Sequence, residues 1–232
     1  MSGLHMLRIP IHAPRLLRFA AEHGITQEDE TLGYTLHAWF AALFGDMAPK
    51  PFRHMSRRNE VLAYAESDAV TLLDHAQALA SPQAWAVMDV AGIASKPMPS
   101  VWRTGQRLRV EVLTCPVSRK GDEEKDIYLR ALDRLGSDAP PRAQVYQQWF
   151  AAQWNDALHF EQVELLGMVA RSRLLRRARG GANRLRAIER PQALFAGRAV
   201  IANNESFAAL LARGIGRHRA FGFGMVLLSP SR

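Results

Sequence analysis

Cysteine and long apolar runs are scarce in this sequence. Cys115 is the single cysteine among 232 residues, which excludes an internal disulfide and any zinc site built on cysteine thiolates. No apolar run approaches the ~20 residues that a membrane-spanning helix requires. The opening residues MSGLHMLRIPIH lack the charged segment and apolar core of a signal peptide, so we expect a cytoplasmic protein with no membrane segment.

Histidine pairs at metal-binding spacing are missing as well. The eight histidines include no HxxxH or HxH arrangement, so we expect neither a metal ion nor another cofactor. The apolar fraction of 48% is ordinary for a globular protein and well above the range of disordered chains.

Acidic residues are nearly absent from residues 171–190, although this stretch contains eight arginines. With Glu189 as its one acid, the stretch carries a net charge of +7, which leaves about +1 for the rest of a chain whose total is +8. A basic charge concentrated in one place is typical of a nucleic-acid-binding surface. Charge alone does not distinguish RNA from DNA, and an acidic protein partner is the alternative.

The chain as a whole alternates between strand and helix patterns. Strands are predicted at 7–11, 52–58, 60–65, 106–114, 163–170, 193–202 and 225–228. Helices are predicted at 14–23, 32–44, 68–80, 144–154 and 205–212. A charged loop is expected at 119–126 and a turn at 136–141. This order predicts an α+β fold of two tandem domains, residues 1–136 and 137–232, each a sheet with helices on one face.

Two of the predicted helices have expected caps. Asp68 is placed to cap the helix at 68–80, with Val70, Leu73 and Leu79 on its inward face. Asn204 is expected to cap the helix at 205–212, and Gly214 to end it.

The arginines stand on either side of a Gly180–Gly181 pair, in the sequences RSRLLRRARGG and NRLRAIER. A glycine pair permits a tight reversal, so the stretch is expected to form a hairpin or a helical finger. Guanidinium groups bind phosphate oxygens through two hydrogen bonds and can also reach guanine edges. The expected nucleic-acid contacts are Arg171, Arg173, Arg176, Arg177, Arg179, Arg184 and Arg186.

Residues 214–224, GIGRHRAFGFG, form a second candidate binding loop. Glycines let backbone N–H groups approach a phosphate or a sugar closely. The loop lacks the lysine and Ser/Thr of a Walker loop, and it does not open a helix as a dinucleotide fingerprint does. A capped helix followed by a strand bulge is the alternative. The expected binding residues are Gly214, Gly216, Arg217, His218 and Arg219.

Tyr34 and His37 stand three residues apart in the predicted helix at 32–44. His37 is rotated about 100° from Leu36, which is expected to be buried, and Tyr34 shares the side of the helix that His37 occupies. An imidazole exchanges protons near neutral pH, and a phenol can orient it or donate a hydrogen bond to it. Tyr34 and His37 are therefore the candidate catalytic pair.

The C-terminal part of the chain resembles a known family. The run GIGRHRAFGFGMVLLSP, with ERPQALFAGRAVI shortly before it, is similar to the C-terminal half of the CasE-like CRISPR-RNA-processing endoribonucleases. Tyr34-Thr35-Leu36-His37 matches the Tyr-x-x-His of that family. The resemblance implies two tandem ferredoxin-like (RRM-like) domains, with the arginine-rich hairpin or helical finger in the second. The size of the arginine segment points to a relative in a type IV system as an alternative to type I-E.

The resemblance also implies a function. Precursor CRISPR RNA would be bound as a repeat hairpin and cut without a metal ion, because the ribose 2′-hydroxyl attacks the adjacent phosphate. His37 would act as general base or acid, and Tyr34 would position the nucleophile or His37. The mature crRNA would be retained, and the protein would join a multi-protein effector complex. Arg119 and Lys120 stand where the family has basic residues near its RNA path. A non-catalytic RNA-binding subunit of such a complex is the alternative.

Overall fold

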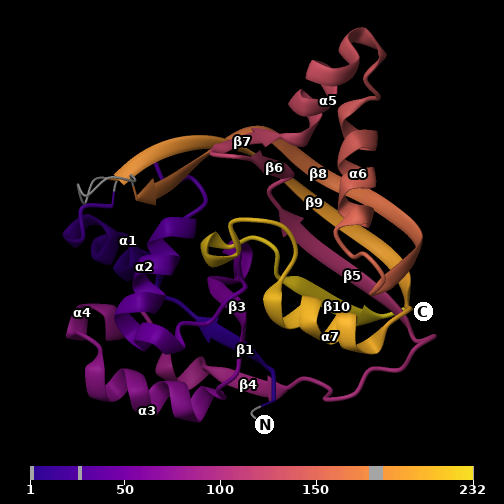
Figure 1. The fold of residues 1–232 in the computed structure, drawn as a ribbon. Helices are drawn as coiled ribbons and strands as arrows, with labels where there is room; N and C mark the ends of the chain where they lie inside the picture. Colours follow the sequence, from indigo (N-terminus) through magenta and orange to yellow (C-terminus); the bar gives the residue numbers. More distant parts are fainter. Residues whose placement is uncertain (1–2, 26–27, 178–184, 232) are drawn as a thin grey trace. The chain divides into compact units, whose positions relative to one another are not determined.

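The computed structural model describes residues 3–25, 28–177 and 185–231, and the chain divides into two compact units (Figure 1). The first unit contains residues 1–100, 173–189 and 220–222, and the second contains 101–172, 190–219 and 223–232. The second unit thus begins at Val101, whereas the predicted boundary lies after residue 136. The reason is that the strand at 107–114 pairs with strands of the second unit.

The first unit is a ferredoxin-like domain built on a four-stranded sheet. Its order along the chain, strand–helix–strand–strand–helix–strand, and its antiparallel sheet order β2-β3-β1-β4 are those of this fold. The strands are β1 His5–Pro10, β2 Phe52–Met55, β3 Glu60–Ala65 and β4 Ala94–Pro97. The helices are α1 Ala13–Glu22, α2 Gly33–Phe44, α3 Ala69–Leu79 and α4 Pro82–Trp85. Short 3-10 turns η1 Gly45–Met47, η2 Ser56–Arg58 and η3 Val90–Gly92 lie between them.

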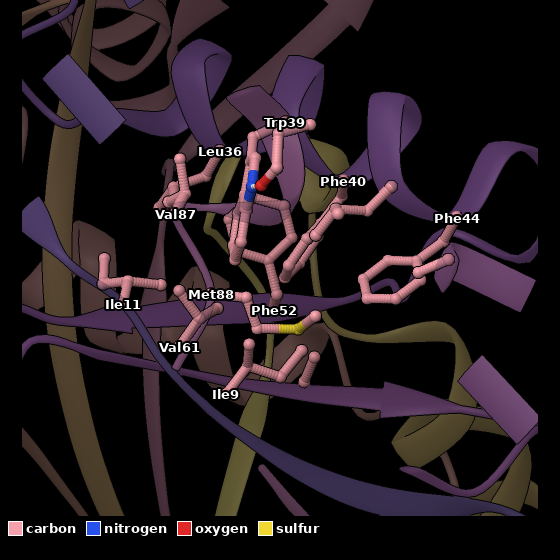
Figure 2. Close-up of a cluster of buried hydrophobic side chains, with 14 of the residues drawn as sticks. Ile9, Ile11, Leu36, Trp39, Phe40, Phe44, Phe52, Val61, Val87 and Met88 are labelled. Atoms are coloured by element: carbon pink, nitrogen blue, oxygen red, sulfur yellow. Dashed lines mark hydrogen bonds between the residues drawn. The ribbon is translucent and has the colours of Figure 1, made fainter. Parts of the chain in front are cut away.

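One side of α2 fills the core of the first unit (Figure 2). Trp39 and Phe40 are buried against the sheet, and Phe40 meets the ring of Phe52 edge-on, with centroids 5.2 Å apart. The indole N–H of Trp39 donates a hydrogen bond to the carbonyl of Ala84, at 2.9 Å. Each large apolar side chain buried in this way contributes about 1.5–3 kcal/mol. The core therefore fixes the rotation of α2 about its axis, and with it the direction of the helix's other side.

The inward side of α3 differs from the prediction. Asp68 caps the helix as expected, since its carboxylate accepts a hydrogen bond from the backbone N–H of Thr71 at 2.9 Å. The buried residues, however, are Ala69, Leu72 and Ala76, whereas Val70 and Leu79 are 66% and 70% exposed and Leu73 is half-buried. The physical reason is tertiary packing, because α3 contacts α2 and its Ala69, Leu72 and Ala76 belong to the same buried cluster as the core residues of α2.

The second unit repeats the ferredoxin-like topology. Its sheet order, β10-β5-β9-β8, is again that of the fold, which confirms the prediction of two tandem ferredoxin-like domains. The sheet strands are β5 Arg107–Thr114, β8 Leu158–Arg177, β9 Leu185–Ile201 and β10 Val226–Pro230. The helices are α5 Ile127–Leu135, α6 Arg142–Ala152 and α7 Asn204–Arg213, with 3-10 turns η4 Gly136–Asp138 and η5 Arg219–Phe221.

Local structure in the second unit departs from the prediction at two places. The expected charged loop at 119–126 is a hairpin of β6 Val117–Lys120 and β7 Glu123–Asp126, which is followed by the unpredicted helix α5. Asp126 starts that helix by accepting a hydrogen bond from the N–H of Tyr128 at 2.8 Å. The cap of α7 is Asn203 and not Asn204, because the Asn203 side chain accepts from the N–H of Ser206 at 3.0 Å.

The arginine segment lies on two neighbouring strands of this sheet. β8 continues through Arg177 and β9 starts at Leu185, so both strands run well beyond the predicted 163–170 and 193–202. The described part of the segment is therefore a pair of neighbouring strands and contains no helix. Arg179 and Arg184 lie outside the described residues.

Candidate active site

The outer side of α2 presents Tyr34 and His37 together. Their ring centroids are 6.2 Å apart and the planes meet at 64°, so one ring points its edge at the other. Tyr34 is 9% exposed, whereas His37 is half-buried. The expected juxtaposition of the two side chains is thus present, and the imidazole retains access to solvent.

A buried carboxylate holds the first turn of this helix. Asp29, which is 4% exposed, accepts hydrogen bonds from the N–H groups of Tyr34 and Thr35, at 3.3 and 2.8 Å, and from the Thr35 hydroxyl at 2.9 Å. Backbone N–H groups at a helix start lack partners within the helix, so a carboxylate there stabilises the first turn. The signal for Asp29 in the sequence is an acid a few residues before the start of a predicted helix.

Phe221 completes an aromatic cluster around this pair. Its ring stacks on Tyr34, with centroids 6.1 Å apart and planes at 13°, and it tilts against His37 at 4.9 Å and 51°. The carbonyl oxygen of Phe221 comes so close to Gly33 that a Cβ there would collide with it. Sequence reasoning missed Phe221 as a site residue, and its position among the glycines of 214–224 was the available signal.

Cations surround His37 and change its acidity. Burial lowers the pKa of His37 below 6.5, and the positive charges of Arg176, Arg177 and Lys50 lower it further. The guanidinium of Arg176 also lies over the Phe221 ring, 4.4 Å from its centre, as in a cation–π pair. The imidazole is consequently neutral at pH 7 and able to accept a proton. Lys50, like Phe221, was not anticipated from the sequence.

The other described arginines of the segment differ in their exposure and in their partners. The exposed ones are Arg171, Arg173, Arg177 and Arg186. The backbone N–H of Arg173 donates to the carboxylate of Glu30 at 2.9 Å, which ties β8 to the segment before α2. Arg190 is paired with Glu124 at 2.6 Å. Four of the expected binding residues thus lie at the surface, and their contacts with phosphates stay a prediction.

Glycines shape the candidate binding loop at 214–224. Gly214, Gly216, Gly222 and Gly224 all have positive φ, between 73° and 86°, which L side chains rarely adopt. At Gly224 a Cβ would also collide with the carbonyl oxygen of Ile215. This backbone is therefore accessible to glycine and strained for other residues.

Glu124 on β7 anchors the same loop. Its carboxylate binds the Arg217 side chain at 2.5 Å and the His218 ring at 2.8 Å, in addition to Arg190. Burial alone would raise the pKa of Glu124, but the hydrogen bonds from His218, Arg190 and Arg217 outweigh burial and hold that pKa well below its usual range. The His218 side chain is 3% exposed and lies against Glu124, and its contact with RNA stays a prediction.

Arg119 and Lys120 lie at the tip of the β6–β7 hairpin. The Arg119 side chain donates to the carbonyl of Gly121 and to Asp122, both at 2.7 Å, while Lys120 is exposed. Both side chains are at the surface of the second unit, where a basic residue can meet a phosphate.

Metal-binding clusters and membrane-spanning helices are both missing from the described residues. No group of three or more His, Cys, Asp or Glu side chains within those residues is arranged to hold a metal ion. None of the helices in the described ranges is long and apolar enough to cross a membrane.

Comparison with known proteins places the chain in a family. Structures with a similar fold include Thermus thermophilus Cse3 bound to an RNA representing a pre-cleavage complex, at 16% identity and a TM-score of 0.65. A further example is Cas6e from Escherichia coli K-12, at 16% identity and a TM-score of 0.57. Another is a chain of a CRISPR RNA-guided surveillance complex, at 19% identity and a TM-score of 0.57. Each comparison covers 98% of this chain and 100% of the other. Among curated proteins no match is found. A family model described as CRISPR associated protein matches residues 4–230, so the chain belongs to this family of CRISPR-associated proteins.

Proposed function

We propose that this protein is an endoribonuclease that binds hairpins of precursor CRISPR repeat RNA, cuts them and retains the mature crRNA. The observation that carries the proposal is the half-buried His37, whose pKa is lowered by burial and by the charges of Arg176, Arg177 and Lys50. A neutral imidazole surrounded by cations is suited to accept a proton where negative charge accumulates on a phosphate.

In the proposed reaction, the ribose 2′-oxygen bonds to the neighbouring phosphorus and the bond from phosphorus to the 5′-oxygen breaks. His37 takes the proton of the 2′-hydroxyl, and the leaving 5′-oxygen takes a proton from solvent. The products carry a 2′,3′-cyclic phosphate and a 5′-hydroxyl. Proton transfer of this kind contributes about 10²–10⁴-fold. DNA lacks the attacking hydroxyl, so the reaction selects RNA.

The roles of the neighbouring groups follow from their contacts. Tyr34 positions His37, because its ring meets the imidazole edge-on at 6.2 Å. Arg176 and Arg177 stabilise the charge that develops on the phosphate, which requires cations close to the base. No step uses a metal ion. The exposed Arg171, Arg173 and Arg186 bind phosphates along the stem, because a base-paired RNA hides its base edges in a deep and narrow groove.

Proteins of similar structure support the proposed RNA substrate and the proposed membership of a multi-protein complex. One is Thermus thermophilus Cse3 bound to an RNA representing a pre-cleavage complex, and another is a chain of a CRISPR RNA-guided surveillance complex. We extend both statements to this chain: its substrate is the repeat RNA, and its assembly is a multi-protein crRNA complex.

Burial of Tyr34 favours a second candidate, a non-catalytic RNA-binding subunit of such a complex. The Tyr34 side chain is 9% exposed and stacks on Phe221, which also suits a structural role. Incubation with an end-labelled repeat hairpin in EDTA distinguishes the two. Cleavage at one position in EDTA supports the metal-free enzyme, whereas tight binding with no cleavage, with or without Mg²⁺, supports the subunit. If the protein neither binds nor cuts the hairpin, both proposals are wrong.

A further inference from the structure

The second unit contains a pocket beside the first half of the glycine-rich loop. Its volume is about 190 Å³, and three arginines, Arg213, Arg217 and Arg219, line it together with Gln153. The remaining lining residues are apolar or glycine. The end of α7 supplies Arg213, and the loop supplies the other two arginines.

The positive charge of this pocket is not balanced within it. None of the described residues that line it is acidic. Arg217 pairs with Glu124, which lies outside the lining, at 2.5 Å. The pKa of Arg219 is lowered by burial and then by the charges of Arg213 and Arg217, as expected where like charges are held together. Like charges gathered at a concave site favour an anionic ligand.

The backbone holds the arginines in place and keeps the pocket open. The Arg219 side chain donates a hydrogen bond to the carbonyl of Arg213 at 3.0 Å, and Glu124 holds Arg217 from the other side. Gly216 has a φ of 73°, and a Cβ on it would lie 3.3 Å from the Trp149 ring. A side chain at this position would therefore be strained and would press on its neighbour. Preorganised donors of this kind bind an anion without a large cost of ordering.

The size of the pocket restricts the ligand. A water molecule has a share of about 30 Å³ in the liquid, so 190 Å³ corresponds to about six waters. Pockets for drug-sized molecules start near 300 Å³. The volume thus suits a phosphate group with part of a ribose.

We propose that the pocket lined by Arg213, Arg217 and Arg219 binds a phosphate group of the RNA that the protein holds. This inference rests on the proposed RNA substrate and adds Arg213 to the binding residues. Arginine forks match phosphate oxygens with paired hydrogen bonds. The phosphate is either an internal phosphodiester or a terminal phosphate, since both present non-bridging oxygens that a guanidinium group can bind.

The test compares Arg213→Ala and Arg213→Ala/Arg219→Ala with the wild type and with Arg134→Ala. Arg134 is an exposed arginine of the same unit, on α5, so it controls for the loss of one positive charge. The RNAs are a repeat hairpin with a 3′-hydroxyl and the same hairpin with a 3′-phosphate, measured by anisotropy over a range of salt concentrations. We expect affinity to fall about tenfold in Arg213→Ala. The salt slope should decrease by about 0.7–0.9 for each phosphate that the protein no longer neutralises.

The two RNAs identify the source of the phosphate. Weaker binding of both RNAs indicates an internal phosphodiester, and weaker binding of the 3′-phosphorylated RNA alone indicates a terminal phosphate. If Arg213→Ala and the double variant keep the wild-type affinity and slope for both RNAs, the pocket does not bind RNA and the inference is wrong. That result leaves the proposed function standing, provided that the wild type still binds and cuts the hairpin.

A second measurement does not depend on RNA. Inorganic phosphate is titrated with each protein and its ³¹P line width is recorded. Broadening by the wild type that disappears in Arg213→Glu supports the pocket even if the wild type fails to bind the hairpin, in which case the proposed function alone is wrong. Broadening that is equal in both proteins contradicts the pocket.

Discussion

The ring of Phe221 lies against the imidazole of His37, with centroids 4.9 Å apart and planes at 51°. The same ring stacks on Tyr34 and carries the Arg176 guanidinium above it. Phe221 thus links the candidate base on α2 to an arginine of β8. Because it comes from the glycine-rich loop, that loop has a part in the candidate active site that its glycines alone did not suggest.

Replacing Phe221 tests this arrangement. In Phe221→Ala we expect the pKa of His37 to rise towards 6.5, because the imidazole becomes more hydrated, and cleavage to slow as Arg176 loses its support. NMR titration of the His37 ring and single-turnover cleavage measure the two effects. Phe221→Tyr keeps the stacked ring and should retain the wild-type pKa of His37 and the wild-type rate of cleavage. An unchanged His37 titration in Phe221→Ala would contradict a positioning role.

The candidate base is tested by His37→Ala. Removal of the imidazole should slow cleavage of the repeat hairpin by about 10²–10⁴-fold while leaving its affinity nearly unchanged. A gel-based assay gives the cleavage rate, and fluorescence anisotropy gives the affinity for the hairpin. His159→Ala is the control, since His159 is exposed on β8. If the His37→Ala protein cuts at the wild-type rate, the catalytic assignment is wrong.

The pH dependence of cleavage follows from the lowered pKa of His37. A general base acts in its neutral form, so the cleavage rate should rise with pH through a midpoint below 6.5 and become constant well above that midpoint. Removing a neighbouring positive charge favours the protonated imidazole, so Arg177→Ala should move the midpoint to higher pH. Arg177→Lys, which keeps the charge, should leave it in place. Single-turnover cleavage rates measured between about pH 5 and 8 give the midpoint for each protein. A midpoint that is the same in all three proteins would show that His37 does not limit the rate.

The arginines of β8 are expected to bind phosphates. Neutralising Arg173, Arg176 and Arg177 together should weaken hairpin binding and reduce the dependence of log Kd on log salt by about two. The matched control replaces the same three residues by lysine, which keeps the charges and should keep most of the slope. Anisotropy titrations over a range of salt concentrations give the slope. A slope that does not change in the alanine variant would refute the phosphate contacts.

Glu124 is expected to stabilise the second unit. In Glu124→Gln the guanidinium groups of Arg190 and Arg217 lose their counter-charge, and removing one partner of a buried pair costs about 3 kcal/mol. The pKa of Glu124 is lowered in the folded state, so its contribution is present above the unfolded value near pH 4.3 and lost as the pH falls below it. Urea unfolding at pH 7 measures the loss. Glu123→Gln, next to it and more exposed, should change stability little.

The sequence by itself determined the elements with strong periodicity and the position of the charge. Leu7 and Ile9 alternate with polar residues, and both are buried in β1 as expected. Leu36, Phe40 and Leu43 follow one another at the i, i+4, i+7 spacing of one side of a helix, and all three are buried in α2. Tyr34 and His37 therefore lie together on the other side of the helix. The concentration of arginine at 171–190 was also readable, because charge is a property of composition and needs no fold.

Only the tertiary structure decided which side of α3 is buried and which residues join His37. Several apolar sides were available to α3, and the buried one is the side whose residues join the core cluster of α2. Phe221 and Lys50 reach His37 from distant parts of the chain, and no local pattern records such contacts. The same holds for the partners of Glu124, since no local pattern records that Arg217 and His218 both reach its carboxylate. A buried carboxylate is costly without hydrogen-bond partners, so Glu124 draws these side chains of the glycine-rich loop towards β7.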